Sequence, residues 1–206
     1  CWQWNEAISL LDTFSSSSSS SSTDTCLNNY AYAALLKVNE LATLASSKTM
    51  AAATTSSSYH NGIKCAMLVL DRMKQDGISP DVITCSTILS TFDKCNNWKA
   101  AVTLLNAMKY HHQAASNDNK SSSRSSSLDN NHNNNQQCWA LPSPNTYTYS
   151  SVITTCAKCN QGDVALMLLN EMEVSCNEDN DNDTMAVVVP NTWDYNAAML
   201  ACTEST

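Results

Sequence analysis

The sequence predicts an all-α protein, an α-solenoid built from pairs of helices, and three observations support this fold class. Apolar residues recur at spacings of three, four and seven in eight short segments. One of these patterns is written twice, because residues 81–108 and 145–172 agree at eleven places after a shift of 64 positions. Polar low-complexity runs separate the segments rather than interrupting them. A helix pair repeated along the chain accounts for all three observations.

One helix of each pair, which we call helix B, is predicted from four segments that share an alanine. Apolar residues follow this alanine at one, three, four and seven places, which forms a single stripe along a helix. The small side chain at the shared position would let a neighbouring helix approach closely. The segments are residues 4–14, 63–73, 98–108 and 164–172, with Ala7, Ala66, Ala101 and Ala165 at the shared position.

The other helix, which we call helix A, is predicted over residues 28–38, 82–94, 146–158 and 192–202. The β-branched residues in these segments would also suit strands. Their apolar residues are spaced by three, four and seven, however, whereas a half-buried strand alternates by two. The spacing therefore favours helices.

The distance between repeats indicates where insertions lie. Ala66 and Ala101 are 35 residues apart, while the neighbouring spacings are 59 and 64 residues, and each excess falls at a junction between helices. An insertion at a turn costs little free energy, because the cost grows only logarithmically with its length. Since the chain starts inside a helix B and stops inside a helix A, we expect the natural chain to continue in both directions. The predicted units are a lone helix B (1–14), a Ser-rich linker (15–27), repeats 28–81, 82–145 and 146–191 with insertions over 45–60, 111–142 and 174–188, and a lone helix A (192–206).

Composition limits the classes of function. Runs rich in Ser, Asn and Asp over 15–22, 116–137 and 177–184 are predicted to be disordered loops, because they have too few apolar side chains to offset the entropy of ordering. The net charge of −8 does not suggest a nucleic-acid binder, but it neither supports nor excludes a local basic groove. Most of the ten cysteines fall among helix-patterned residues, which favours reduced core thiols over a disulfide scaffold. No stretch is long and apolar enough to cross a membrane.

The sequence gives no indication of catalysis, a metal or a cofactor. With only three glycines there is no Gly-rich loop to hold a phosphate, and no His has a plausible Ser, Cys or Asp partner on the predicted helices. Cys156 and Cys159 form a C-x-x-C that could supply half a zinc site, but no second such motif exists and structural thiols are favoured. His111 and His112 lie beside a loop that contains a further His and Cys, where metal binding is the less favoured alternative. We therefore expect a non-enzymatic protein without a cofactor.

The helix pair of 35 residues that ends in Pro-Asp or Pro-Asn resembles the pentatricopeptide repeat family. This resemblance implies a right-handed superhelical α-solenoid. Tetratricopeptide repeats share the helix pair and the alanine, but they usually carry a glycine in helix A where this chain has larger residues. The residues that carry the resemblance are GISPD (77–81), LPSPN (141–145), VVPN (188–191), Tyr149, Lys94-Cys95 and Ala157-Lys158-Cys159.

The function that the resemblance implies is binding of single-stranded RNA, with about one base per repeat. Family members act in RNA processing, stability or translation in organelles, which implies a mitochondrial or chloroplast location. Protein partners could bind the convex face or the loops. The alternative is a protein-interaction scaffold of the tetratricopeptide type, which the acidic net charge slightly favours.

A second stripe on helix A, separate from the apolar one, is mostly polar and predicts an RNA-facing surface. It begins with a bulky residue and ends with a lysine 11 residues later, which is about three turns. A base wedged against the bulky residue would leave the lysine near phosphates, although packing between repeats and ordinary solvent exposure are alternatives. The predicted base-stacking residues are Ile83, Tyr147 and Trp193, and the predicted phosphate contacts are Lys94 and Lys158.

The family reads base identity with the fifth residue of a repeat and the last residue before the next one. Transferred to this chain, the pairs are Ser86 with Asn145 and Ser150 with Asn191, a hydroxyl and an amide that resemble the combination favouring adenine. Asn196 is the fifth residue of the last unit. In the first complete repeat, Asp81 is paired with Ala33, which offers no hydrogen bond and departs from the family pattern.

Overall fold

The structure is a computed structural model that describes residue 9 and residues 29–49, 55–121, 139–177 and 188–203. All the secondary structure in these ranges is α-helical. The predicted helix B over 4–14, apart from Ser9, the Ser-rich linker and much of each insertion lie outside the described residues. The helices are α2 (Asn29–Thr49), α3 (Thr55–Gln75), α4 (Val82–Lys94), α5 (Trp98–Ser121), α6 (Thr146–Lys158), α7 (Gly162–Asn177) and α8 (Thr192–Thr203).

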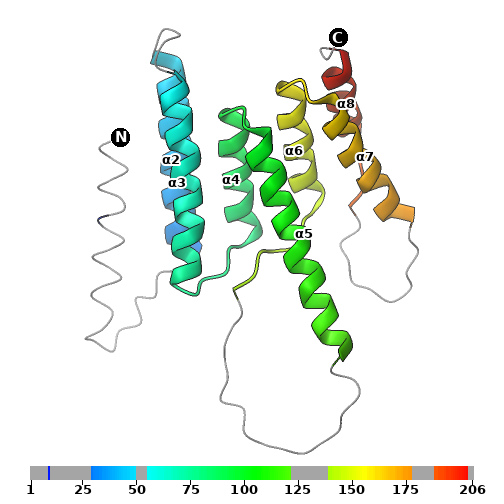
Figure 1. The fold of residues 1–206 in the computed structure, drawn as a ribbon. Helices are drawn as coiled ribbons and strands as arrows, with labels where there is room; N and C mark the ends of the chain where they lie inside the picture. Colours follow the sequence, from blue (N-terminus) through cyan, green and yellow to red (C-terminus); the bar gives the residue numbers. More distant parts are fainter. Residues whose placement is uncertain (1–8, 10–28, 50–54, 122–138, 178–187, 204–206) are drawn as a thin grey trace, which may run out of the picture.

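The helices stand side by side in chain order and form two layers (Figure 1). Helices α2, α4, α6 and α8 pack against one another in that order, and we call them the A layer. Helices α3, α5 and α7 form the B layer, in which each helix packs against the A-layer helix before it and the one after it. The predicted all-α solenoid of paired helices is therefore confirmed. The right-handed superhelix stays a prediction.

Short polar side chains explain why α4 and α6 begin and end at the predicted residues. The side chains of Asp81 and Asn145 accept hydrogen bonds from backbone amides in the first turn, which satisfies donors that a helix start leaves unpaired. At the other end, Asn96 and Asn160 have φ angles of 48° and 55°, a left-handed conformation that Asn tolerates better than most residues. The recurrence of Asn at this place thus reflects the turn that ends helix A.

The core lies between the two layers and contains the predicted stripes. Ala66, Ala101 and Ala165 are completely buried, so the alanine that the B segments share lies inside the packing between helices. The valine or leucine side chains three and four places later are also buried. Removing one such side chain, for example Leu105→Ala, would cost about 2–5 kcal/mol of stability, because a cavity remains.

Several helices run further than the apolar pattern places them. Helix α2 continues to Thr49, α3 already begins at Thr55 and α5 continues to Ser121, although the sequence places insertions over 45–60 and 111–142. The reason is that a helix needs no apolar stripe to add turns, since its backbone hydrogen bonds are local and Ala, Lys and Ser are tolerated there. The division of the chain into repeats stays a prediction.

The chain rejoins the fold before α6 through a docked segment. The Trp139 ring lies 5.5 Å from both the Lys74 ammonium group and the His111 ring, and Leu141 is buried in the core. The Ala140 amide donates a hydrogen bond to the Ser79 hydroxyl at 3.2 Å. Helix α6 accordingly packs on α4 as α4 packs on α2, although 30 residues lie between Tyr110 and Leu141 along the chain.

The described cysteines are free thiols that belong to the packing. Burial raises the pKa of the Cys85 and Cys156 thiols to about 12 and that of Cys95 to about 11, which makes them poor nucleophiles. Cys156 of the C-x-x-C motif is buried, whereas Cys159 donates to the Asn96 carbonyl oxygen at 3.2 Å. Within the described ranges, no three His, Cys, Asp or Glu residues are grouped as metal ligands would be.

Candidate nucleic-acid interface

A cavity of about 540 Å³ opens on the A layer over helix α6. Four residues that the sequence predicts as RNA contacts line it together, namely Tyr147, Ser150, Asn191 and Trp193. They come from α6, from the N-cap of α8 and from α8 itself, so the fold brings side chains of successive repeats to one place. The other lining residues are Ser90, Asp93, Thr146, Ser151 and Thr154.

The three predicted stacking residues point away from the core. Ile83, Tyr147 and Trp193 are 64%, 59% and 66% exposed. Trp193 also reaches across to the preceding helix, because its indole N–H donates to the Thr154 hydroxyl oxygen at 3.3 Å. These flat or branched apolar side chains are therefore exposed to solvent rather than buried between repeats.

The two predicted base-reading serines have different surroundings. The Ser86 hydroxyl donates to the Val82 carbonyl oxygen of its own helix at 2.6 Å. The Ser150 hydroxyl oxygen is covered and has no hydrogen-bond partner among the described residues, although it lines the cavity. Leaving a covered hydroxyl unpaired costs about 1–3 kcal/mol, which a suitable ligand would recover. Ser150 is therefore the better placed of the two to contact a ligand.

The predicted partners at the repeat ends also cap helices. The side-chain oxygen of Asn145 accepts from the Thr148 amide at 2.9 Å, and that of Asn191 accepts from the Trp193 amide at 2.8 Å. The Asp81 carboxylate accepts from the Thr84 amide at 2.7 Å. Capping leaves the NH₂ group of each asparagine as the part of the amide that can donate to a ligand. Asn196 is exposed on α8 and does not line the cavity.

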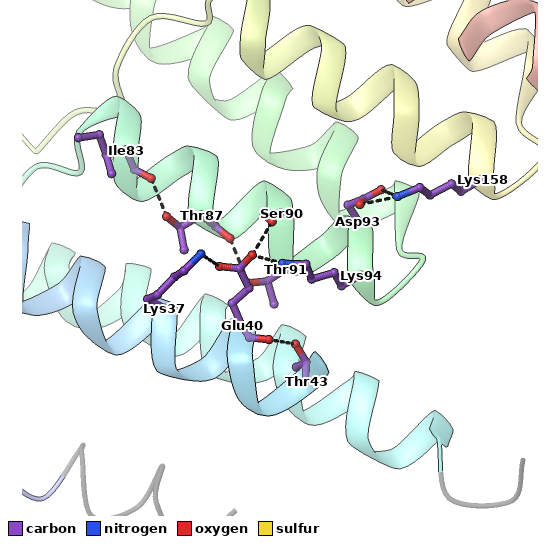
Figure 2. Close-up of polar contacts among 10 residues, drawn as sticks. All are labelled: Lys37, Glu40, Thr43, Ile83, Thr87, Ser90, Thr91, Asp93, Lys94 and Lys158. Atoms are coloured by element: carbon purple, nitrogen blue, oxygen red, sulfur yellow. Dashed lines mark hydrogen bonds and ion pairs between the residues drawn. The ribbon is translucent and has the colours of Figure 1, made fainter. Parts of the chain in front are cut away.

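Both predicted phosphate lysines form ion pairs across the A layer (Figure 2). Lys94 of α4 pairs with Glu40 of α2. Lys158 of α6 pairs with Asp93 of α4, with distances of 2.6 and 2.8 Å from its ammonium nitrogen to the two carboxylate oxygens. The sequence analysis missed both acids. An available signal was that Glu40 and Asp93 occupy the same place in helix A, one residue before the place of the lysines.

The Glu40 carboxylate is largely enclosed. Its side chain is only 4% exposed, and it accepts hydrogen bonds from Lys94, from Lys37 at 2.7 Å and from the Ser90 hydroxyl at 2.7 Å (Figure 2). Burial alone would raise the pKa of the Glu40 carboxyl. The three donors outweigh burial and hold this pKa at about 2, so the group is ionised under all physiological conditions.

The Asp93 carboxylate is more open. Its side chain is 22% exposed, its partner Lys158 is 49% exposed, and both remain accessible from solvent. Asp93 lines the cavity, and its further contact to the Thr155 hydroxyl is long at 3.4 Å. An ion pair this exposed contributes about 0–1 kcal/mol, so a ligand could rearrange it at low cost.

A stack of helix pairs with a cavity on one layer defines the chain as an α-solenoid repeat protein. A family model described as "Pentatricopeptide repeat domain" matches residues 59–113, and one described as "PPR repeat" matches residues 147–176. The chain belongs to the pentatricopeptide repeat family. No curated protein matches it. Among the described helices, none is long and apolar enough to cross a membrane.

Proposed function

We propose that this protein binds single-stranded RNA on the A layer, in a sequence-selective and non-catalytic manner. The observation that carries the proposal is the cavity in which the exposed rings of Tyr147 and Trp193 accompany the unpaired Ser150 hydroxyl. Proteins of this repeat family generally bind RNA, which supports the same conclusion. The flat side chains, together with hydroxyl and amide groups in the lining, suit a nucleobase better than an apolar peptide side chain.

Stacking supplies the part of the affinity that does not depend on base identity. Tyr147 and Trp193 occupy the same place in successive A-layer helices, and Ile83 occupies it one helix earlier. A base between two such side chains contacts one on each face, and stacking on an aromatic ring is worth about 1–3 kcal/mol per base. We assign the base-stacking role to Ile83, Tyr147 and Trp193.

Selectivity would come from the pairs Ser150 with Asn191 and Ser86 with Asn145. A serine hydroxyl can accept and an asparagine NH₂ group can donate, while adenine presents an amino donor beside a ring-nitrogen acceptor. The Ser150 pair is thus complementary to adenine. The Ser86 pair has the same composition, but the hydroxyl would first have to leave the Val82 carbonyl. Asp81 and Asn196 are proposed to select bases in the first complete repeat and in the last unit.

Lys158 is the better candidate for contacting a phosphate. Its half-exposed side chain pairs with Asp93, which lines the cavity, and its ammonium group can turn toward an RNA backbone. A phosphate at Lys94 would have to displace the buried Glu40 carboxylate. The two lysines therefore differ in how readily they could bind an RNA phosphate.

In the cell we propose that such binding protects or remodels an organellar transcript, in a mitochondrion or a chloroplast. Occupying a strand would block nucleases and competing RNA structure, and would recruit other factors. The chemistry then belongs to the partners, because the proposed site only holds and selects the RNA.

Filter binding at low salt with fluorescent single-stranded RNA tests the proposal. The probes are U-rich oligonucleotides that contain an adenine pair or lack it, together with duplex RNA of the same sequence. We expect the strand with adenines to bind best, the duplex to bind weakly, and Trp193→Ala to weaken binding several-fold while Trp193→Phe retains most of it. Equal binding of all probes, or wild-type affinity in Trp193→Ala, would contradict the assigned site. Binding of peptides but not RNA would favour the scaffold alternative.

A further inference from the structure

Two of the boundaries between neighbouring A-layer helices contain the same kind of ion pair, but the acid of the pair differs in length. We call the boundary between α2 and α4 the first seam and that between α4 and α6 the second seam. At each seam an acidic residue at the same repeat position of one helix pairs with the final lysine of the next A-layer helix (Figure 2). The acid is glutamate at the first seam and aspartate at the second, so the carboxylate groups differ in reach by one methylene.

At the first seam the longer side chain occupies the polar stripe of α4. Glu40 binds Lys94 and also accepts from the Ser90 hydroxyl, one turn earlier on the same face. Lys37 of its own helix completes the coordination. At the position of Ser86 and Ser150, α2 carries Ala33, which has no hydroxyl to offer a ligand.

At the second seam the shorter side chain binds only the end of the stripe. Both carboxylate oxygens of Asp93 face Lys158, and no hydrogen bond between Asp93 and Thr154 occurs in this described part of the chain. Thr154 is the counterpart of Ser90, and its hydroxyl oxygen instead accepts from the Trp193 indole. Ser150 and Thr154 of the α6 stripe line the cavity, as does Ser90 of α4, whose hydroxyl is already bonded to Glu40.

We propose that the length of this acidic side chain decides whether a seam can admit a nucleotide, so that Glu40 closes the first seam and Asp93 leaves the second open. This inference rests on the proposed RNA binding. RNA then contacts the chain from Ile83 onward and gains nothing from Lys94. Glu40 acts as an internal anion, because its carboxylate fills the place that a phosphate would need between Lys37, Ser90 and Lys94.

The reciprocal exchanges Glu40→Asp and Asp93→Glu test this directly, since each keeps the charge and changes only the reach. In filter binding with adenine-containing single-stranded RNA, Asp93→Glu should weaken binding about tenfold, because its carboxylate can now reach Thr154. Glu40→Asp should bind at least as well as wild type. Glu40→Gln, which also removes the competing charge, should steepen the dependence of log affinity on log salt by about 0.7, the value for one additional phosphate contact on a single strand.

A second measurement needs no RNA and separates this inference from the proposed function. Amine acetylation followed by mass spectrometry reports how accessible each lysine is in the free protein. We expect Lys158 to be acetylated several times faster than Lys94 in wild type. In Glu40→Asp, the acetylation rate of Lys94 should rise to nearly that of Lys158. Thermal unfolding confirms that each variant is folded.

The outcomes are distinct. A wild-type protein that does not bind RNA overturns the proposed function, while the acetylation rates still decide whether Glu40 encloses its seam. A wild type that binds RNA, with neither exchange altering affinity or lysine reactivity, overturns the inference about acid length alone. Tighter RNA binding in Asp93→Glu would also overturn the inference about acid length.

Discussion

The first and second seams of the A layer contain the same kind of ion pair, but the first pair is enclosed and the second is open to solvent. Both join an acid to the final lysine of the next helix, but Glu40 is enclosed by three donors while Asp93 and Lys158 stay open at the rim of a cavity. The comparison teaches that equivalent places in a repeat protein need not be equivalent sites. A difference of one methylene determines how much of the neighbouring polar stripe a carboxylate occupies.

Removing each acid should have the largest effect and should separate the two seams most clearly. Glu40→Ala leaves Lys94 without its buried partner and is expected to cost about 3 kcal/mol of unfolding free energy, the lower end for breaking a buried pair. Asp93→Ala should cost less than about 1 kcal/mol, as for exposed pairs. Urea unfolding followed by circular dichroism measures both. Equal costs would mean that the seams do not differ in burial.

The pH dependence of stability sharpens the same comparison. The pKa of Glu40 is about 2 in the folded protein and 4.5 ordinarily, so folding favours the ionised form. Its contribution is fully present above pH 4.5 and is lost as the pH falls toward 2. Between pH 5 and pH 3 this loss should amount to about 2 kcal/mol.

Glu40→Gln is the matched control for this titration, because it retains the shape of the side chain without a titrating group. Urea midpoints recorded at intervals of half a pH unit should fall less steeply for this variant than for wild type. Parallel curves for the two proteins would show that Glu40 is not the group responsible.

A smaller effect is expected when the two serines are compared. Ser150→Ala should reduce discrimination between adenine and uracil at one RNA position by about 1 kcal/mol, near the lower limit for a specific base contact. Ser86→Ala should change it less, because the Ser86 hydroxyl already bonds its own helix. Competition filter binding with single-base variants of the RNA measures both. A larger effect at Ser86 would reverse the assignment of the open site.

The smallest effect concerns the lysines. Lys158→Ala should weaken all RNA sequences alike and lower the slope of log affinity against log salt by about 0.7, while Lys94→Ala should leave the slope unchanged. Titrations at four salt concentrations give the slopes. If Lys94→Ala lowers the slope as much as Lys158→Ala does, Glu40 does not keep Lys94 from the RNA.

What the sequence could predict was local along the chain. The apolar spacing predicted α4 and α6 to the residue, and the shared alanine predicted buried positions at Ala66, Ala101 and Ala165. The periodicity also placed Tyr147, Ser150 and Trp193 on one side, because residues with helical spacing share a face whatever packs on them.

The periodicity of the sequence could not predict the contacts between helices across the seams. Whether Lys94 meets Glu40, or Trp193 meets Thr154, depends on the distance and rotation between two helices and on side-chain length. Periodicity also could not predict that α2, α3 and α5 extend into polar stretches, since extra turns need no apolar stripe. The asparagines at the repeat ends were predicted as base readers, but their capping hydrogen bonds required the backbone geometry.

The docked segment that holds Trp139 and Leu141 has a consequence for how this chain can change over generations. Because the segment is fixed against α3, α5 and the core before Asn145 is reached, residues can be gained or lost upstream of it without moving α6. A change in the length of that stretch therefore does not alter the order in which the later helices contact a ligand.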